Sequence, residues 1–325
     1  MTGARIRRIF IPMTPRSLII FGQGQLGHCY RDYFEQKGVA VHMPALDIRD
    51  AAAVNAALDA ARPDLVINVA AKTNIDWCEQ NKIECFAVNT LGAAVIGEAC
   101  AARGISLAHL SSGCVQESKT KDAVWGEDDP VSPLCFYAWT KVWAENLLRD
   151  AAARRGLKVL ILRPRQLLSS VVSTRNAVTK LLTYSRFIDA ANSCTIVEDL
   201  MWVTEELIRR DATGTFNVVN PGVTSPYEIA LLLKEMVKPE MECIKIEKEE
   251  LNHMTLAKRV DSVLSTAKLN ALGILLPEIH ARLREILAQF KLNMEAEASR
   301  AVLEKTEAET RQKLSLGAAT FTEYA

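Results

Sequence analysis

A glycine-rich turn that follows a short apolar run constrains the fold of this chain more than any other feature. Residues 17–21 read Ser-Leu-Ile-Ile-Phe, as expected of a buried strand, and the turn Gly22-Gln23-Gly24-Gln25-Leu26-Gly27 comes next. At the start of a helix, the first glycine permits a tight turn, the second lets the backbone approach a pyrophosphate, and the third allows close helix packing. A motif of this kind that stands alone is often only a turn needing a positive φ. A second motif is therefore needed to support a dinucleotide site.

Tyr137 and Lys141 supply that second motif. Residues four apart on a helix share one face, so we expect the Lys141 ammonium beside the Tyr137 phenol. A neighbouring positive charge favours the ionised form of a phenol, whose pKa is ordinarily about 10, and makes it a usable proton donor near neutral pH. In this order and at this separation, the two motifs resemble those of the short-chain dehydrogenase/reductases.

The first half of the chain alternates between short apolar runs and longer amphipathic segments. We predict strands over 17–21, 39–43, 65–69, 105–110 and 158–162, and helices over 25–37, 50–62, 82–103 and 136–155. Strands separated by helices imply βαβ units. The fold class predicted is α/β, with a Rossmann-like doubly wound parallel sheet.

The regular alternation ends near Arg163-Pro164-Arg165. Only short elements are expected afterwards, over 176–184, 199–210, 215–219, 226–237 and 276–290. We therefore predict a flexible N-terminal extension (1–16), a dinucleotide-binding domain (17–163), a smaller C-terminal substrate lobe (164–290) and a charged tail (291–325). The tail is expected to be an exposed fraying helix, a disordered segment or a partner-binding segment.

Composition excludes several classes of function. Of the 325 residues, 39 are basic and 39 acidic, so no basic footprint indicates nucleic acid or an anionic membrane as a partner. No apolar run reaches the roughly 18 residues of a membrane span. The eight cysteines form no C-x-x-C pair, which favours reduced thiols, a cytoplasmic location and no metal site.

Ser112 and Cys114 follow the strand predicted over 105–110, at the edge of the sheet where doubly wound folds bind ligands. The Ser112 hydroxyl there can hydrogen-bond the carbonyl that Tyr137 protonates; the alternative is a serine that caps a turn. Cys114 taken alone is more often a small buried apolar residue than a reactive thiol.

The stretch after the second strand leaves the phosphate state of the cofactor open. An acid there grips a ribose 2′-hydroxyl and an arginine accepts a 2′-phosphate, but Met43-Pro44-Ala45-Leu46 contains neither. Asp47 is close enough in sequence to reach an adenine amino group. A helix cap or a solvated turn residue is an equally good interpretation of Asp47.

Four further segments narrow the resemblance. They are Asn74-Ile75-Asp76-Trp77-Cys78-Glu79, Ser112-Gly113-Cys114, Arg175-Asn176-Ala177-Val178-Thr179-Lys180 and Phe216-Asn217-Val218-Val219-Asn220-Pro221-Gly222-Val223. With Asn68-Val69-Ala70-Ala71 and Asn89, they resemble extended short-chain dehydrogenase/reductases acting on nucleotide sugars, and in particular the plant-type bifunctional nucleotide-rhamnose synthases, the UDP-4-keto-6-deoxyglucose 3,5-epimerase/4-reductases. The resemblance covers residues 17–290.

The resemblance implies a set of site residues. Catalysis would involve Ser112, Tyr137 and Lys141 in reduction, with Cys114 and Lys180 in epimerisation. The cofactor would contact Gly22, Gly24, Gln25, Leu26, Gly27, Asp47, Ile48, Asn68, Ala70, Ala71, Asn89, Tyr137 and Lys141. The substrate would contact Thr73, Asn74, Arg175, Asn176 and Arg259, where arginine suits a diphosphate; a surface salt bridge is the alternative for each arginine, and a solvated surface charge is the alternative for Lys180.

The resemblance also implies NADPH as the cofactor, with NADH as the second option. The family's turn usually reads G-x-x-G-x-x-G; here it is one residue shorter, and Gln23 stands where an arginine would help to hold a 2′-phosphate. Gln116 also replaces the phenylalanine that is usual two residues after the cysteine.

Three functions compete. The first is a bifunctional 3,5-epimerase/4-reductase that makes UDP-L-rhamnose from a nucleotide-linked 4-keto-6-deoxyhexose. The second is a 4-reductase alone, resembling dTDP-4-dehydrorhamnose reductase, which a Cys114 remote from the sugar pocket would favour. The third is a non-catalytic cofactor-sensing subunit, since a fold does not dictate a function. The partner expected is the nucleotide sugar, with a homodimer as the assembly to test.

Overall fold

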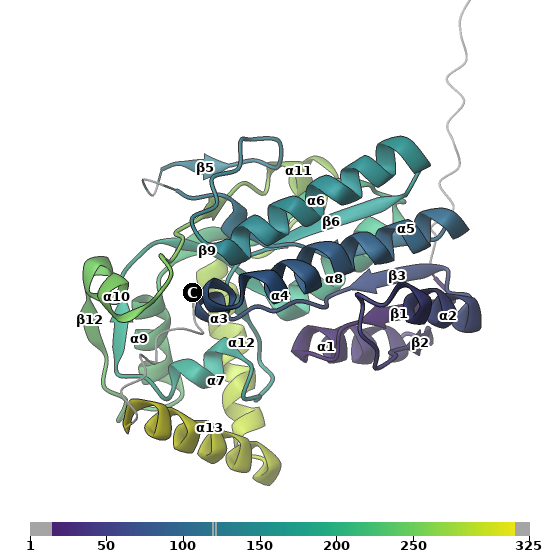
Figure 1. The fold of residues 1–325 in the computed structure, drawn as a ribbon. Helices are drawn as coiled ribbons and strands as arrows, with labels where there is room; N and C mark the ends of the chain where they lie inside the picture. Colours follow the sequence, from purple (N-terminus) through teal and green to yellow (C-terminus); the bar gives the residue numbers. More distant parts are fainter. Residues whose placement is uncertain (1–14, 119, 121, 316–325) are drawn as a thin grey trace, which may run out of the picture.

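The computed structural model describes residues 15–118, 120 and 122–315. Its first half alternates strands and helices (Figure 1). The order is β1 (Ser17–Phe21), α1 (Gln25–Glu35), β2 (Ala40–His42), α2 (Ala51–Ala61), β3 (Leu65–Asn68), α3 (Ile75–Gln80), α4 (Lys82–Phe86), the π-helical η1 (Ala87–Gly92), α5 (Ala93–Arg103), β4 (Ser106–Leu110), the short 3-10 helix η2 (Gly113–Val115), β5 (Val124–Trp125), α6 (Phe136–Arg155) and β6 (Val159–Pro164). The predicted alternation is therefore present.

The main sheet has six strands in the order β10-β6-β4-β3-β1-β2, where β10 spans Gly214–Val218. Every neighbouring pair is parallel. The chain reverses direction across the sheet between β1 and β3, where Phe21 pairs with Asn68. This crevice at the carboxyl ends of β1 and β3 is where doubly wound folds bind ligands. The predicted Rossmann-like fold is confirmed.

Each strand divides its side chains between two buried layers because successive residues point to opposite faces. On one face, Leu18 and Ile20 of β1 pack with α1 and α8 (Val197–Arg209). On the other face, Ile19 and Phe21 pack with α2, α5 and α6. The helices α5 and α6 cover the face that is turned toward the viewer in Figure 1. The strands are thus held from both sides, which fixes their carboxyl ends.

The second half forms a smaller lobe around its own apolar core. Its elements are β7 (Leu167–Leu168), α7 (Ala177–Leu181), β8 (Arg186–Ile188), β9 (Asn192–Ile196), β11 (Asn220–Thr224), α9 (Pro226–Met236), β12 (Ile244–Ile246), α10 (Lys248–Met254), β13 (Val263–Leu264), α11 (Ala267–Ala271), α12 (Ile279–Met294) and α13 (Glu297–Ser315). The strands make a three-stranded sheet, β11-β9-β7, and two pairs, β12-β8 and β13-β5. Of these elements, α11 packs through Leu269 against the main sheet.

The two lobes do not divide at residue 163, where the sequence placed the boundary. Strand β10 completes the main sheet beside β6, and α8 packs against it, so residues 197–218 return to the first lobe. The chain therefore crosses between lobes more than once. The predicted N-terminal extension lies almost wholly outside the described residues.

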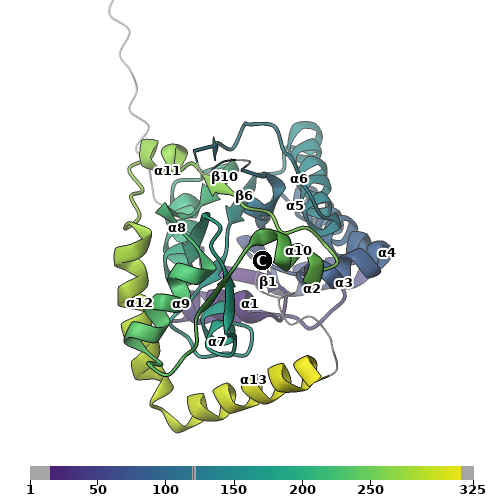
Figure 2. The ribbon, with the colours of Figure 1, turned by 90° about the vertical axis from the view of Figure 1, so that its left-hand side faces the viewer.

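The charged tail begins as helix within the described residues. Helix α12 continues to Met294, and α13 then runs below α7 (Figure 2). A hydrogen bond of 3.2 Å joins the Thr183 and Thr310 hydroxyls, and the Lys238 ammonium lies 3.0 Å from the Glu307 carboxylate. Helix α13 is thus docked on the substrate lobe through residues 303–310 rather than free of it.

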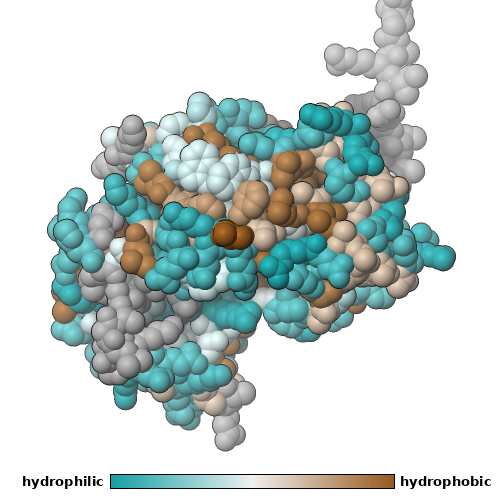
Figure 3. Space-filling view, viewed as in Figure 1, coloured by the Kyte–Doolittle hydropathy of each residue, from teal (hydrophilic) through white to brown (hydrophobic). Residues whose placement is uncertain are grey.

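The stretch Lys82–Arg103 has the length and composition of a membrane span, with a mean hydropathy of 1.5, and half of the window is buried inside the protein. It packs between α2 and α6, as a core helix of a Rossmann domain does. Exposed apolar side chains also gather over α4, η1 and α6 on the face shown in Figure 3, including Ile83, Leu91, Trp139 and Leu147.

Candidate active site

A cavity of about 780 Å³ lies at the carboxyl edge of the main sheet, with walls from both lobes. Thirteen of the residues proposed from the sequence line it: Gly24, Gln25, Leu26, Gly27, Ala71, Thr73, Asn74, Ser112, Cys114, Tyr137, Lys141, Arg175 and Lys180. The structure therefore brings the glycine turn, the Tyr137/Lys141 pair and the two residues of the predicted epimerisation into one space.

The glycine turn has the geometry that a phosphate cradle needs. Gly22 has φ +123°, and a Cβ there would lie 2.7 Å from the Ala70 nitrogen. A Cβ at Gly27 would lie 2.0 Å from the Gly22 carbonyl oxygen, so α1 can approach β1 only with glycine at that position. At Gly24 the space is open, and the nearest atom to a Cβ would be Arg175 Nη1 at 3.5 Å. The turn thus leaves room above Gly24 at the amino end of α1, where anions bind favourably.

Two asparagines of the proposed cofactor site support the backbone instead of lining the cavity. Asn68 is buried at the end of β3, where its Oδ1 accepts from the Ala70 nitrogen and its Nδ2 lies 3.1 Å from His109 Nδ1. Asn89, in the π-helical turn, accepts from the Lys72 nitrogen and donates to the Lys72 carbonyl oxygen. Both therefore fix the loop from Val69 to Asn74.

The segment after β2 is arranged by its own side chains. The Gln23 amide donates to the carbonyl oxygens of Met43 and Pro44, at 3.0 and 3.1 Å. Asp47 forms an ion pair with Arg49 at 2.5 Å, and this arginine holds the pKa of Asp47 below its usual value. The helix cap considered for Asp47 belongs instead to Asp50, which accepts from two amides at the start of α2. The Ile48 side chain packs in the core against Gly92.

Ser112, Tyr137 and Lys141 converge at the end of β4. Lys141 Nζ donates to the Leu110 carbonyl oxygen at 2.9 Å and lies 5.9 Å from the centroid of the Tyr137 ring. Burial raises the pKa of Tyr137, and the Ser112 hydroxyl opposes that shift only in part. Burial also lowers the pKa of Lys141 to about 8. The lowered phenol pKa expected from the Tyr137/Lys141 pair is therefore not seen in this structure, because burial raises the pKa of Tyr137.

The Tyr137 phenol is accordingly a neutral proton donor. The Ser112 hydroxyl accepts from the Cys114 nitrogen at 3.2 Å, so it also caps the short helix η2. The Ser112 hydroxyl lines the same cavity as Tyr137, and its catalytic role stays a prediction.

Cys114 lies in the same cavity and touches a residue that the sequence did not single out as functional. Its Sγ is 3.3 Å from Nη1 of Arg165, which follows directly on β6. Arg165 is buried, with 4% of its surface exposed. In the sequence, Arg165 appeared only as the point where the regular alternation ends. Cys114 and Arg165 are far apart in the chain, so no short sequence pattern predicts their contact.

Helix α7 carries the substrate-lobe wall. Lys180 and Ala177 line the cavity from this helix, and Arg175 lies just before it. Asn176 does not line the cavity: its Oδ1 accepts from the Val178 nitrogen at the start of α7, and its Nδ2 donates to the carbonyl oxygens of Ser169 and Val171. Asn176 therefore fixes the helix that presents Lys180.

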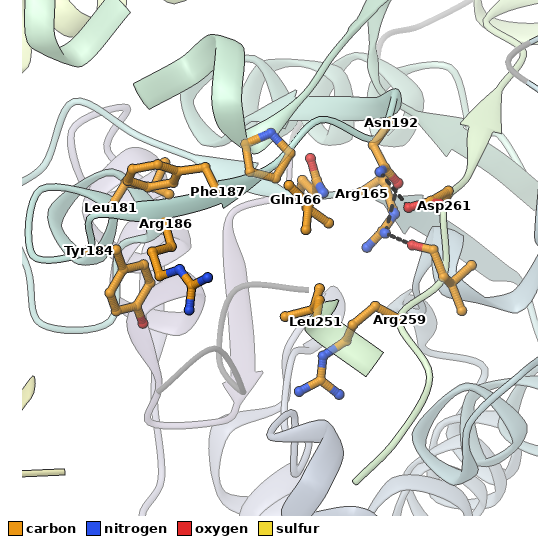
Figure 4. A pocket seen from close by; sticks show the side chains of 13 residues that line it. Arg165, Gln166, Leu181, Tyr184, Arg186, Phe187, Asn192, Leu251, Arg259 and Asp261 are labelled. Carbon is orange, nitrogen blue, oxygen red and sulfur yellow. Dashed lines mark hydrogen bonds between the residues drawn. The ribbon is translucent and has the colours of Figure 1, made fainter. Parts of the chain in front are cut away.

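A second, smaller pocket adjoins the first, and Arg259 lines it rather than the main cavity. Figure 4 shows the guanidinium groups of Arg165, Arg186 and Arg259 around this pocket, with Leu251 and the ring of Tyr184. Arg259 also forms a buried ion pair of 3.0 Å with Asp76, which excludes the exposed salt bridge considered from the sequence. Arg165 and Gln166 line both pockets, so the two spaces are adjacent at these residues.

Further lining residues were not proposed as site residues from the sequence. They include Lys72, Trp77, Ser111, Gln166, Thr174 and Glu309. Glu309 comes from α13, so the tail helix also contributes to the wall of the cavity. Ser111 donates to buried Glu145 at 2.5 Å, and Glu145 binds Arg163 through both carboxylate oxygens. This network lies directly beneath Ser112.

The arrangement supplies three chemical capabilities. The cavity is lined by a backbone cradle that suits phosphate, by two hydroxyl groups that can donate to a carbonyl oxygen, and by a thiol and an amine. Two hydroxyl donors aimed at one oxygen stabilise the charge that develops there during reduction or enolisation.

A family model agrees with this geometry. Residues 16–292 match the model of the RmlD substrate binding domain. The chain belongs to this family. The match ends within α12, so α13 lies beyond it.

Relatives include proteins of plants, bacteria, archaea and a virus. A bifunctional dTDP-4-dehydrorhamnose 3,5-epimerase/dTDP-4-dehydrorhamnose reductase of Arabidopsis thaliana is 28% identical over 264 residues, which cover 78% of this chain and 86% of the relative. The chain spans only 39% of a trifunctional dehydratase/epimerase/reductase of the same plant, at 29% identity. Among solved structures, the L780 UDP-rhamnose synthase from Acanthamoeba polyphaga mimivirus has a TM-score of 0.78 and 28% identity, over 84% of this chain and 99% of that one. A dTDP-4-dehydrorhamnose reductase from Clostridium acetobutylicum has a TM-score of 0.76 and 25% identity, over 86% of this chain and all of the other.

Proposed function

We propose that this chain is a bifunctional 3,5-epimerase/4-reductase of a nucleotide-linked 4-keto-6-deoxyhexose, and that it makes UDP-L-rhamnose. The observation that carries the proposal is the position of Cys114 in the same cavity as Ser112, Tyr137 and Lys180. A reductase alone needs the hydroxyl donors but no thiol or amine beside them. The names of the Arabidopsis and mimivirus relatives add support for the sugar and for both activities.

The reductive step follows from the two hydroxyl donors. The C4 ketone of the sugar would accept hydrogen bonds from Ser112 and Tyr137, and a nicotinamide supplies hydride to C4 when it is bound. Tyr137 gives its proton to the C4 oxygen as that oxygen becomes an alcohol. The buried phenol suits this role because it stays neutral at working pH and passes its proton only to a developing oxyanion.

The epimerising step uses the same ketone before reduction. A ketone at C4 acidifies the hydrogens at C3 and C5, and the Ser112 and Tyr137 hydroxyls stabilise the enolate. Cys114 lies in the first lobe and Lys180 lies on α7 of the second, so they approach the sugar from different elements. One removes a proton and the other returns it on the opposite face, which inverts the carbon.

We also propose that the second pocket receives the nucleotide. Its apolar and aromatic walls suit a flat base, and the guanidinium group of Arg186 suits a diphosphate. The pocket is adjacent to the main cavity at Arg165 and Gln166, so we expect a diphosphate that links base and sugar to lie near these residues.

We propose NADPH as the cofactor. The residues present fit a dinucleotide, because a Cβ at Gly22 or Gly27 would fill the space that the close turn requires, while Gly24 leaves an open cradle. Reductase structures of the same fold are named as NADP and NADPH complexes. Since Gln23 binds backbone carbonyls and Asp47 binds Arg49, we expect a modest preference for NADPH with measurable use of NADH. Comparison of kcat/KM for the two cofactors tests this, and a strong NADH preference contradicts it.

Incubation with UDP-4-keto-6-deoxyglucose and NADPH, with the sugar product identified by NMR, tests the proposed function. We expect UDP-L-rhamnose. A product reduced at C4 but not inverted at C3 and C5 indicates the reductase alternative, and no turnover with any 4-keto nucleotide sugar indicates the cofactor-sensing alternative. The intact Ser112, Tyr137 and Lys141 argue against the latter. The homodimer and the cytoplasmic location stay predictions.

A further inference from the structure

Arg165 is the buried arginine whose charge has no carboxylate partner at the site. Arg163, two residues earlier, pairs with Glu145 at 2.7 Å, and Arg259 pairs with Asp76 at 3.0 Å. Among the residues that the structure describes, no acidic side chain forms an ion pair with Arg165. A buried charge is costly unless it is compensated, so an anion is expected beside this guanidinium during function.

The guanidinium is held at a fixed place by neutral groups. Its Nη2 donates to Asn192 Oδ1 at 2.9 Å and to the Val260 carbonyl oxygen, as Figure 4 shows. The Arg165 backbone nitrogen donates to Thr195 Oγ1 at 3.0 Å. The next residue, Gln166, has φ +39°, a left-handed conformation that is uncommon for a residue other than glycine. With Nη2 held by these groups, Nη1 lies 3.3 Å from Cys114 Sγ.

We propose that Arg165 is a positioning residue for proton transfer by Cys114, and that its guanidinium is the countercharge for the Cys114 thiolate. The proposal rests on the epimerase half of the proposed function. In the step concerned, the thiolate takes the proton from the carbon beside the C4 ketone: an S–H bond forms, the C–H bond breaks, and the electron pair moves to the C4 oxygen. Return of a proton to the opposite face by the Lys180 ammonium leaves a thiol and a neutral amine, which exchange protons with water to restore the starting state.

The buried Nε of Arg165 has no hydrogen-bond partner among the described residues. A guanidinium has five donors, so Arg165 has donors left for a second anion while Nη1 is directed at the sulfur. A diphosphate on that side is the competing explanation of the unpaired charge. The countercharge explanation requires Arg165 to favour the Cys114 thiolate before any substrate is present, whereas the diphosphate explanation does not.

Alkylation of Cys114 by iodoacetamide, followed by peptide mass spectrometry at neutral pH in the full-length protein without substrate, separates them. Only the thiolate reacts, so loss of the countercharge in Arg165→Gln should slow alkylation of Cys114 by about tenfold. Arg186→Gln is the matched control, because Arg186 lines the same pocket but pairs with Glu250 rather than with the thiol. It should leave the alkylation rate unchanged.

The second readout is solvent deuterium at C3 and C5 of the sugar. In Arg165→Gln, kcat for deuterium incorporation should fall by at least about tenfold, because one positioned charge is removed. The kcat for 4-keto reduction of a pre-epimerised sugar should stay within about threefold of the wild-type value, because the hydroxyl donors remain. If Arg165→Gln does not fold, the alkylation rate of Cys114 in Arg165→Lys tests the proposal instead. Lysine retains the positive charge, so Cys114 should react within about threefold of the wild-type rate.

An unchanged alkylation rate in Arg165→Gln, or a tenfold loss in Arg165→Lys, overturns the proposal. A rise in KM for every nucleotide sugar with unchanged alkylation assigns Arg165 to the diphosphate instead and also overturns it. Absence of deuterium with the wild-type enzyme is a different result: it refutes the epimerase function, whereas the alkylation rates still report on Arg165.

Discussion

The Tyr137 phenol and the Lys141 ammonium are buried on the inner face of α6, and burial favours the uncharged form of each. Sequence spacing correctly places the two residues on one face, but it carries no information about how much water reaches them. The direction of the Tyr137 pKa shift could therefore not be predicted from the pair alone. The neutral phenol fits a donor that protonates an oxyanion late in the reaction.

Replacement of Tyr137 by phenylalanine removes this donor and keeps the ring. We expect 4-keto reduction to fall by on the order of 10² to 10⁴, because one positioned acid is lost. Cofactor binding, measured by fluorescence titration with NADPH, should be retained. Turnover near that of the wild type would remove Tyr137 from the mechanism.

The pH dependence of reduction should reflect Lys141. Burial lowers the pKa of Lys141 from 10.5 to about 8, so the ammonium is present below pH 8 and is lost as the pH rises through that value. Its charge stabilises the phenolate left on Tyr137, so the rate of NADPH oxidation with a pre-epimerised 4-keto sugar should decline above about pH 8. Lys141→Arg keeps the charge and should move this decline to higher pH, at a lower overall rate. A wild-type profile that is flat from pH 7 to about 10 contradicts the assignment.

At the scale of secondary-structure elements, a buried network joins β4, α6 and β6 beneath the reacting groups. Glu145 of α6 accepts from Ser111 and from Nε and Nη2 of Arg163. Burial acts to raise the pKa of Glu145, but Arg163, Ser111 and Arg149 outweigh it, and the pKa is lowered overall. The carboxyl ends of two strands and the helix that carries Tyr137 are thereby fixed to one another.

Glu145→Gln should lower the free energy of unfolding by about 3–5 kcal/mol, because it leaves the buried Arg163 charge unpaired. Glu98→Gln is the control: Glu98 pairs with Arg155 on the surface, and its loss should cost less than about 1 kcal/mol. The pKa of Glu145 is lowered in the folded state. The difference in free energy of unfolding between the wild type and Glu145→Gln is therefore fully present above pH 4.5 and becomes smaller as the pH falls below that value. Urea titrations of the three proteins at pH 7 and near pH 4 measure both effects; equal loss in the two variants at pH 7 would count against the network.

At the scale of the whole molecule, the sequence predicted the first lobe well because its elements are local. Apolar runs and glycine positions indicate β1, α1 and β3 without knowledge of their partners. The strands of the second half are two to five residues long and pair with distant partners: β13 pairs with β5, and β10 pairs with β6 in the main sheet. No local period marks such pairings, so the return of α8 and β10 to the first lobe and the docking of α13 were not predicted.

The candidate site divides in the same way. The glycine turn and the Tyr137/Lys141 pair followed from physical reasoning on short motifs, whereas Cys114 and Lys180 followed only from a family resemblance. Their meeting in one cavity depends on the lobes packing together, as does the contact between Cys114 and Arg165. That meeting is the basis of the claim that one site performs both reactions.

Solvent deuterium in the sugar product tests this claim most directly. Wild-type enzyme in D₂O with UDP-4-keto-6-deoxyglucose and NADPH should give a product with deuterium at C3 and C5, detected by NMR. Cys114→Ala and Lys180→Ala should each abolish this deuterium, yet both variants should oxidise NADPH with a pre-epimerised 4-keto sugar, because Ser112, Tyr137 and Lys141 are unchanged. Wild-type product without deuterium at either carbon would contradict the account and leave the chain a 4-reductase alone.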